Sequence, residues 1–415
     1  MFALVDCVSF YASCEAVFRP DLRDKPILVM SNNDGCCVTL NEQAQNLGFQ
    51  KFRPFFELQP LINQHQAAVF SSNYELYSSL SKRVMDILAT FASDHEVYSI
   101  DESWLDFTGH KDLRTTGHQM IAAVQQQTGL ATRVGFGSNK TLCKVASVIA
   151  KRVKRAKGVC CIDDDNEQRK AILARFPVGE VWGVGSKTAA KLNQLGIYSA
   201  LELAEYDKDA IRAQFGITIE RTSHELNGQK CFNFHEDIVE QHQIMVSRSF
   251  GKPIYDLQPL QSLTISYLEK AMEKLRANNQ LVRHIAISAS TSRFSRSYRS
   301  IHNVITLPIY TNDTLTAAKY VSQGLEQCYQ RHKFVRSMVC LTSLRASQYY
   351  QPDLLEPEDS SKSKNLMEVI DTLNAGNQKN IYLARAPKKT EWDMKRLFKS
   401  PEYTTDWKDL PRVKC

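Results

Sequence analysis

An acid interrupts each of two apolar stretches that otherwise have the composition of buried strands. The first, FALVDCVSF, is nearly continuous apolar sequence broken only by Asp6. Such a run is typical of a strand inside a sheet. The second, VYSIDESWLDF, carries the adjacent acids Asp101 and Glu102 in a polar turn at Asp101–Ser103. Burying a carboxylate costs free energy unless a cation compensates its charge, so the fold has to bring a cation or water to these side chains.

Two interpretations of these acids are open from their spacing alone. In the first, Asp6, Asp101 and Glu102 hold Mg²⁺, which prefers oxygen ligands and usually takes only a few carboxylates. Two such ions, held close together, can clamp the attacking and leaving oxygens of a phosphoryl transfer. In the second, Asp6 is paired with a lysine, and Asp101 and Glu102 sit in a solvated turn.

Composition narrows the class of protein. The chain has 415 residues, of which 43% are hydrophobic and 23% charged, as in folded globular proteins, and this length suggests roughly two to four domains. No apolar run approaches the roughly 18 residues of a membrane span, and the N-terminus lacks the basic start of a signal peptide. We therefore expect a cytoplasmic protein with no membrane association. The 11 cysteines show no zinc-ligand spacing, which argues against a zinc site and favours a reduced compartment.

Positive charge is concentrated in two regions, although the formal net charge of +7 is modest. Residues 140–157 contain seven basic side chains and no acidic one, and residues 241–345 contain 14 basic against five acidic ones. A single basic run is usually a solvated helix face. Two separate basic regions favour binding to a polyanion, and nucleic acid is the polyanion that we expect.

The pattern of apolar residues predicts an α+β protein of several domains. In the first 165 residues we expect strands at 2–10, 25–31, 97–107 and 131–138 and helices at 40–49, 72–91 and 118–127. Residues 176–207 predict a helix–hairpin–helix, because the glycines of VWGVG permit a tight turn and the next helix begins with N–H groups that suit a phosphate. A turn that serves only packing is the alternative.

A boundary falls near residues 232–243, which are polar and lack periodicity. The order from Ile244 to Leu344 predicts a compact βαββαβ domain. Its strands are expected to carry Arg248, Arg283, Arg293, Arg296, Arg299 and Arg336. A linker rich in proline, serine and charge follows, and the tail holds one expected helix, NLMEVIDTLN, before a polar end.

Eight segments together resemble the Y-family translesion DNA polymerases, and most closely their UmuC branch. They are FALVDCVSFYASCE, SNNDGCCV, SSNYELYSSLSKRV, YSIDES, VWGVG, SRSFGKPI, MEVIDTLN and WDMKRLFKSPEYTTDW, and they span essentially the whole chain. The resemblance implies a right-hand polymerase with a palm (1–22 and 75–165), small fingers (23–74), a helix–hairpin–helix thumb (166–232), a βαββαβ little finger (240–345) and a tail (346–415). It also implies error-prone, template-directed DNA synthesis past lesions in the SOS response to DNA damage, without proofreading.

The resemblance assigns roles to individual residues around two Mg²⁺ ions. Asp6 and Asp101 match the metal-bridging aspartates, Glu102 matches the catalytic glutamate, and the carbonyl of Cys7 matches a main-chain metal ligand. Tyr11 matches the steric gate, whose ring excludes a 2′-hydroxyl on the incoming nucleotide. The other residues implied at the dNTP are Phe10, Thr39, Asn41 and Lys151. Those implied at primer–template DNA are Gly183, Gly185 and Lys187 in the thumb and Arg248, Arg293 and Arg296 in the little finger.

The tail and the family suggest protein partners. QPDLL resembles the peptide that docks in the groove of a sliding clamp, with Gln351, Leu354 and Leu355 as its anchors. An ordinary linker is the alternative. The resemblance also implies binding to a dimer of a self-cleaved UmuD-type protein and to a RecA filament.

The chain departs from the family pattern in the fingers. Leu40 and Gln45 stand where basic residues that touch the triphosphate are expected, which predicts a high KM for dNTPs. A DNA-binding scaffold with impaired catalysis is therefore an alternative function. A two-metal nuclease is another, but the presence of Tyr11 beside Asp6 argues against it, because a nuclease has no use for a sugar gate.

Overall fold

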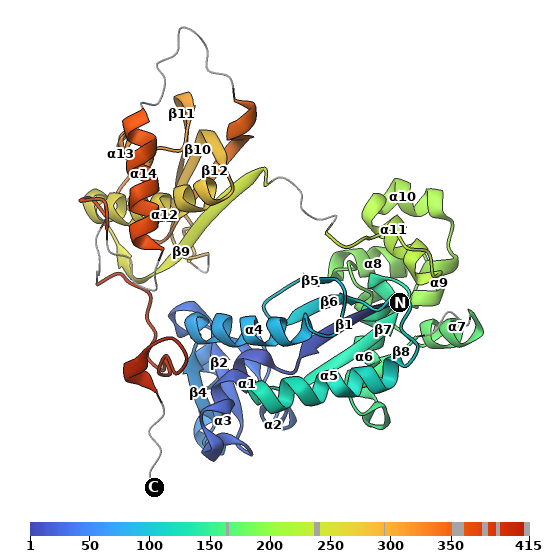
Figure 1. Cartoon of the computed structure of the whole chain (residues 1–415). Coiled ribbons are helices and arrows are strands. Elements are labelled where there is room, and N and C mark those ends of the chain that lie inside the picture. Colours follow the sequence, from blue (N-terminus) through green and yellow to red (C-terminus); the bar gives the residue numbers. More distant parts are fainter. Residues whose placement is uncertain are drawn as a thin grey trace. The chain divides into compact units, whose positions relative to one another are not determined.

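The structure is a computed structural model that describes residues 1–162, 166–235, 241–293, 295–350, 361–375, 381–386 and 391–410 (Figure 1). The chain divides into two compact units. The first comprises Met1–Ser31, Cys36–Ile238 and Phe398–Cys415, and the second comprises Asn32–Gly35 and Val239–Leu397. Within the described residues, no helix is both long enough and apolar enough to cross a membrane.

A five-stranded sheet forms the centre of the first unit, in the order β5-β6-β1-β7-β8 (Figure 1). Its strands are β1 (Phe2–Cys7), β5 (His95–Val97), β6 (Glu102–Asp106), β7 (Thr132–Gly137) and β8 (Val159–Cys161). The helices around it are α1 (Phe10–Val17), α4 (Tyr74–Leu88), α5 (Leu113–Thr128) and α6 (Lys140–Arg152). Neighbouring strands are antiparallel except β7 and β8, which are parallel, so the predicted mixed sheet is confirmed.

Strand β1 serves two cores because its side chains alternate between the faces of the sheet. Val5 enters a large core that includes residues of α1, α4 and α5. Leu4 faces the other way and packs with Trp104 and with Cys143 of α6. By the same alternation Asp6 lies on the face of Leu4, at the end of the strand. The strand is therefore buried along its length, while its one acid lies at an edge of the core.

Helix α6 lies directly against β7, because two glycines of that strand leave room for the helix backbone. A Cβ atom at Gly135 would lie 2.4 Å from the backbone nitrogen of Ser147, and one at Gly137 would lie 2.8 Å from that of Cys143. Only glycine permits such an approach. The contact brings the basic helix α6 next to the strands that carry the acids.

Two expected elements differ from the structure. The N-terminal strand ends at Cys7 rather than Phe10, because Ser9 adopts a left-handed conformation (φ 46°) and a helix begins at Phe10. The turn between β5 and β6 lies at residues 98–101, so Glu102 belongs to the strand and not to the turn. Apolar composition marked both regions correctly, but it does not reveal where one residue reverses the chain.

A smaller sheet of the first unit has the order β3-β2-β4. Its elements are β2 (Ile27–Met30), β3 (Cys37–Leu40), α2 (Glu42–Asn46), α3 (Phe55–His65) and β4 (Ala68–Ser71), with a small core of their own. The helices that follow β8 are α7 (Asn166–Ala174), α8 (Ser186–Gln194), α9 (Ala200–Glu205), α10 (Lys208–Phe215) and α11 (Ile217–Leu226). Strands β3 and β4 and helix α3 were not expected from the sequence.

The second unit has a four-stranded antiparallel sheet in the order β11-β10-β12-β9 (Figure 1). Its elements are β9 (Gln243–Ile254), α12 (Leu257–Ala277), β10 (Gln280–Ser290), β11 (Ser300–Thr311), α13 (Thr314–Cys328) and β12 (Phe334–Ala346). The predicted βαββαβ order is therefore confirmed. Apolar residues of both helices pack on one face of the sheet.

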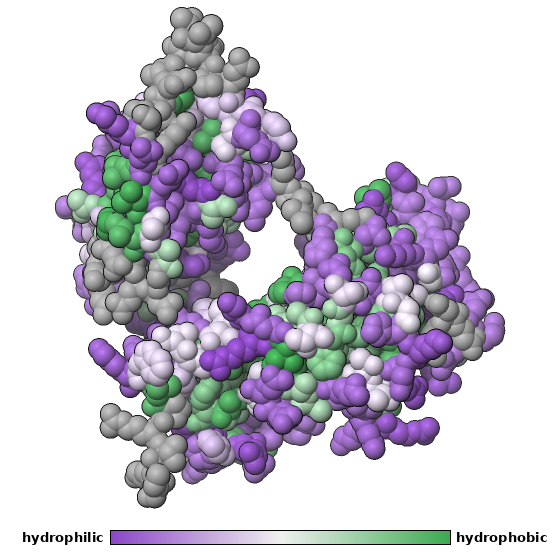
Figure 2. All heavy atoms as spheres, viewed as in Figure 1, coloured by the Kyte–Doolittle hydropathy of each residue, from purple (hydrophilic) through white to green (hydrophobic). Residues whose placement is uncertain are grey.

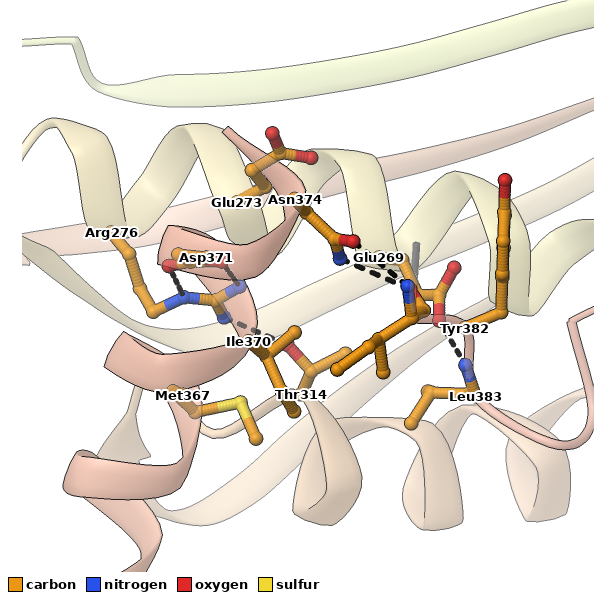
Figure 3. A pocket seen from close by; sticks show the side chains of 11 residues that line it. Glu269, Glu273, Arg276, Thr314, Met367, Ile370, Asp371, Asn374, Tyr382 and Leu383 are labelled. Atoms are coloured by element: carbon orange, nitrogen blue, oxygen red, sulfur yellow. Dashed lines mark hydrogen bonds and ion pairs between the residues drawn. The ribbon is translucent and has the colours of Figure 1, made fainter. Parts of the chain in front are cut away.

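Helix α14 (Ser361–Asn374) packs against this unit beside a pocket that Figure 3 shows. The guanidinium of Arg276 in α12 donates to both carboxylate oxygens of Asp371 in α14, at 2.6 and 2.7 Å. Leu366, Val369 and Leu373 of α14 are exposed, and Figure 2 shows hydrophobic surface over this helix. The helix that the sequence predicted in the tail is thus confirmed and anchored by a two-pronged ion pair.

Candidate active site

Three carboxylates meet at one end of the central sheet. Asp6 in β1 is paired with Glu102 in β6, so the two side chains leave the sheet on the same face. The backbone N–H of Cys7 donates to the carbonyl oxygen of Asp101 at 2.9 Å, which ties the turn before β6 to the end of β1. Ser99 holds this turn, because its hydroxyl donates to a carboxylate oxygen of Asp101 at 2.6 Å. Antiparallel pairing thus gathers acids that are far apart in the sequence.

Burial and neighbouring acids outweigh the positive charges near the Asp6 carboxylate. Burial, followed by the negative charges of Glu102 and Asp101, raises its pKa to about 7, although Lys144 and Arg133 oppose the change. Carboxylates that share a site repel one another when all are ionised. A bound cation would relieve this repulsion and favour the ionised form of Asp6.

Lys144 of α6 supplies positive charge to Glu102. Its Nζ donates to both carboxylate oxygens at 2.8 Å, in a partly buried ion pair. The same ammonium lies 4.7 Å from the ring centroid of Tyr98. Sequence reasoning missed this role, since Lys144 appeared only as one member of the basic run 140–157. The available signal was its position in a helix that has to pack against the acidic strands.

The donor set is of the kind that Mg²⁺ prefers, namely carboxylates and a nearby main-chain carbonyl. The side chains do not form a ready-made cluster, however. In the part of the chain that the structure describes, no group of three or more His, Cys, Asp or Glu side chains is arranged to hold a metal ion. Because Glu102 is held by Lys144, binding of an ion by all three acids competes with that ion pair.

Aromatic side chains lie next to these acids. The ring of Tyr11 stacks on Tyr77 with centroids 4.5 Å apart, and it meets Tyr74 edge-on at 6.1 Å. Burial raises the pKa of Tyr11, and the charges of Tyr74 and Asp101 add to this effect, which places Asp101 near the phenol. Phe10 is 3% exposed and belongs to the core, so it supports the site without facing it.

A buried acid, Glu15, lies behind this aromatic stack. The hydroxyl of Tyr77 donates to Glu15 Oε1 at 2.6 Å, and the hydroxyl of Ser400 donates to the same oxygen at 3.1 Å. Burial raises the pKa of Glu15 to about 7, although both hydrogen bonds lower it. In the folded protein the protonated form of this side chain is therefore favoured below about pH 7.

We predict that Glu15→Gln changes how stability depends on pH. The pKa of Glu15 rises from 4.5 to about 7 on folding, so between these values protons bind the folded state more tightly and stability falls as pH rises. Below 4.5 both states are protonated, and above about 7 both are ionised. Glutamine does not titrate, so over this range the variant should gain roughly 3 kcal/mol relative to the wild type. Unfolding of both proteins across this pH range measures the difference, and a constant difference contradicts the prediction.

The residues expected over the nascent base pair lie in the smaller sheet. Thr39 is half-buried in β3. The side-chain oxygen of Asn41 accepts from the backbone N–H groups of Ala44 and Ile27, each at 3.0 Å, and its amide donates to the carbonyl of Lys25 at 2.8 Å. Asn41 therefore caps α2 and joins it to β2, a structural role that the sequence interpretation did not include.

The two residues that depart from the family pattern, Leu40 and Gln45, differ in burial. Leu40 is 1% exposed in the core of the smaller sheet, so the expectation that it stands at a triphosphate contact is wrong. A charged side chain there would be buried and unpaired. Gln45 is exposed on α2, and its contact with a triphosphate stays a prediction. Lys151 is exposed in the last turn of α6.

The predicted thumb residues surround the start of α8. Gly183 has a φ of 86°, in the left-handed region that favours glycine. Gly185 precedes the first turn of α8 and offers no side chain to cap it. Lys187 is exposed in that turn. Uncapped N–H groups beside an exposed lysine suit a phosphate oxygen.

The predicted arginines of the second unit lie at different places on it. Arg293 and Arg296 are exposed in the connection between β10 and β11, and not on a strand as expected. Arg248 in β9 lies opposite Ser337 in β12, and the Ser337 hydroxyl forms a hydrogen bond with a side chain of α12. The side chain of Arg248 therefore points to the face of the sheet that the helices cover. The residues predicted to bind a sliding clamp, Gln351, Leu354 and Leu355, lie outside the described residues.

Family profiles match most of the chain. The impB/mucB/samB family matches residues 5–148, its C-terminal domain matches 241–354, and the IMS family HHH motif matches 166–197. A domain of unknown function, DUF4113, matches residues 364–413. The motif match confirms the predicted helix–hairpin–helix.

Relatives and solved structures agree with these profiles. The chain is 38% identical to the protein ImpB of Salmonella typhimurium over 99% of both chains, and 38% identical to the protein UmuC of the same species over 100% of both. It resembles the solved structure of a Y-family DNA polymerase chimera, Dbh-Dpo4(243-245)-Dbh, with a TM-score of 0.63 at 20% identity, over 83% of this chain and 99% of that one. The fold expected from the sequence is therefore confirmed.

Proposed function

The chain belongs to the impB/mucB/samB family of Y-family DNA polymerases, and from this membership we propose that it is an error-prone polymerase for translesion synthesis. The reaction is the attack of a primer 3′-hydroxyl on the α-phosphate of a dNTP, with release of pyrophosphate. The observation that carries the proposal is the meeting of Asp6, Asp101 and Glu102 at one end of the sheet, beside Tyr11.

In this proposal Asp6, Asp101 and Glu102, with the carbonyl of Cys7, would hold two Mg²⁺ ions. Mg²⁺ bound by these residues would supply the positive charge that activates a primer hydroxyl and stabilises a triphosphate. The chain keeps the acids in place through the pairing of β1 with β6 and through the hydrogen bond between Cys7 and Asp101. Lys144 orients Glu102 through hydrogen bonds to both of its carboxylate oxygens.

The other predicted residues select and position the substrates. The ring of Tyr11 excludes the 2′-hydroxyl of a ribonucleotide, and Lys151 binds the triphosphate. Phe10 supports Tyr11 from the core, while Thr39 and Asn41 shape the fingers over the base pair. The turn at Gly183–Lys187 and the arginines Arg293 and Arg296 bind backbone phosphates of primer–template DNA. Such contacts carry no sequence information, as a polymerase that copies any template requires.

The cellular role follows from the same family. We place the enzyme in the cytoplasm, in the SOS response to DNA damage, acting without a proofreading activity. Its proposed protein partners are a cleaved UmuD-type dimer, a RecA filament and the sliding clamp, with residues 351–355 as the clamp-binding peptide. The burial of Leu40 removes one of the two reasons for a non-catalytic scaffold.

We predict that Gln45→Lys lowers the KM for dNTPs by roughly tenfold, because one charge-assisted hydrogen bond to the triphosphate is restored. Gln45 is exposed, so lysine fits there without burying its charge. A dNTP titration in single-nucleotide insertion measures the change. Gln43→Lys places the same charge on the same short helix and should leave the KM unaltered. An unchanged KM in Gln45→Lys contradicts the prediction.

Primer extension on an undamaged and an abasic template tests the proposed function. The full-length protein is assayed with Mg²⁺, sliding clamp, cleaved UmuD-type dimer and RecA filament. We expect extension on both templates, with frequent misincorporation. Retained binding to primer–template DNA without nucleotide incorporation under any of these conditions would instead support the scaffold. Degradation of the primer would support the nuclease.

A further inference from the structure

The C-terminal segment Phe398–Tyr403 is built into the first unit. The N–H of Phe398 donates to the hydroxyl of Ser71 at 3.0 Å, and the N–H of Ser71 donates to the carbonyl of Phe398 at 3.1 Å. The ring of Tyr403 stacks on Phe18 with centroids 4.7 Å apart. The segment therefore contacts both β4 and the end of α1, although more than 300 residues separate it from them in the sequence.

A chain of hydrogen bonds runs from this segment into the protein. The side-chain amide of Asn73, which is fully buried before α4, donates to the carbonyl and to the hydroxyl of Ser400, at 3.1 and 2.9 Å. The Ser400 hydroxyl then donates to Glu15 Oε1, which also accepts from the hydroxyl of Tyr77. Asn73, Glu15 and Tyr77 are all 0% exposed, so water does not compete for these bonds.

This relay of hydrogen bonds, from Asn73 through Ser400 and Glu15, ends at Tyr77. The ring of Tyr77 contacts Tyr11. Tyr77 is held at its hydroxyl by Glu15, and its ring is nearly parallel to that of Tyr11, with an angle of 15° between the planes. A shift of the Tyr77 ring therefore moves the surface on which Tyr11 rests. Glu15 lies on α1 together with Tyr11, so the relay also fixes α1 relative to α4.

We propose that Ser400, Glu15 and Tyr77 are positioning residues for sugar selection, through which the C-terminal segment supports the sugar gate without contacting the nucleotide. The proposal rests on the role of Tyr11 as the sugar gate. Discrimination between dNTP and rNTP depends on the exact height of that ring under the sugar, because a small displacement makes room for a hydroxyl. The relay holds the Tyr11 ring through Tyr77, whose side chain is fully buried and does not reach the nucleotide. It assigns a task to the last part of the domain of unknown function, residues 364–413.

Single-nucleotide insertion of a dNTP and of the matching rNTP by the full chain tests this proposal. Tyr77→Phe keeps the stacked ring but loses the bond to Glu15, and Ser400→Ala loses the other bond. Each should raise the ratio of rNTP to dNTP insertion roughly three- to tenfold, the effect of one lost hydrogen bond, with dNTP insertion close to that of the wild type. Lys399→Ala, which removes only ion pairs to Glu75 and Glu402, should leave the ratio unaltered.

Repeating the measurement in a Tyr11→Ala background distinguishes an effect on the position of Tyr11 from general destabilisation of the protein. In Tyr11→Ala, Tyr77→Phe should add nothing to the ratio, because the gate through which it acts is absent. A ratio that stays at the wild-type value in both Tyr77→Phe and Ser400→Ala overturns the proposal. So does a further change of the ratio in the Tyr11→Ala background. If the wild type inserts no dNTP, the proposed function fails instead, which is a distinct outcome.

Discussion

Asp101→Ala is expected to lower the rate of primer extension by at least about 10³-fold, because a carboxylate that holds the catalytic cations is lost. Binding of primer–template DNA should be retained, since the proposed phosphate contacts lie on other elements. The fold should also survive, because the hydrogen bond that joins this turn to β1 uses the main-chain carbonyl of Asp101 and not its side chain.

The matched control for this variant is Asp106→Ala at the other end of β6. Asp106 accepts hydrogen bonds from the N–H and the hydroxyl of Thr108, at 2.8 and 2.6 Å, and thus serves a local turn. We expect Asp106→Ala to lose about 1 kcal/mol of stability, as for a lost hydrogen bond, and to keep extending primers. Single-turnover incorporation measures the rate of extension by each variant, and a DNA-binding assay measures whether Asp101→Ala still binds primer–template DNA. If Asp101→Ala extends primers at a rate within tenfold of the wild type, the carboxylate of Asp101 is not required for catalysis.

Tyr11→Ala is expected to reduce the preference for dNTPs over rNTPs by roughly 100-fold, the scale on which a shaped pocket rejects one added hydroxyl. The ring is fixed on two sides by Tyr77 and Tyr74, so it cannot turn away from a 2′-hydroxyl at low cost. Alanine leaves that space empty, and the ribose then fits.

Insertion of a dNTP and an rNTP opposite the same template base measures this effect as a ratio. Tyr11→Phe is the control, because it keeps the ring and should keep most of the discrimination. Loss of dNTP insertion in Tyr11→Ala without a change in the ratio would show that Tyr11 supports the site in another way. If Tyr11→Ala keeps the full preference for dNTPs, a residue other than Tyr11 excludes ribonucleotides.

Local pattern predicted much of the fold. The β7 strand, the long α4 helix and the whole βαββαβ unit followed from the spacing of apolar residues, because each element buries one face or both along its own length. The errors fell at chain reversals. Ser9, in a left-handed conformation, ends the N-terminal strand early, and the turn before Glu102 is shifted, since such reversals depend on single residues and not on a repeat.

Pairings between distant residues could not be predicted from the same pattern. Lys144 belongs to a run of basic residues, and only the packing of α6 on β7 brings it to Glu102. Leu40 aligned with a basic position in the family pattern, yet its side chain lies in the core. Asn41 uses its side-chain oxygen to accept from the backbone of both β2 and α2.

The sequence by itself determined the chemistry of this protein: which acids interrupt buried strands, which aromatic residue follows the first of them, and which segments are basic. Residue identity and local spacing carry that information, because the donor and acceptor atoms that a side chain offers are set by its residue type. The tertiary structure decided how those groups act together. Register across β1 and β6 pairs Asp6 with Glu102, and the fold brings the hydroxyl of Ser400 to the carboxylate of Glu15. Such contacts depend on the whole chain closing around one core, so no stretch of sequence contains them.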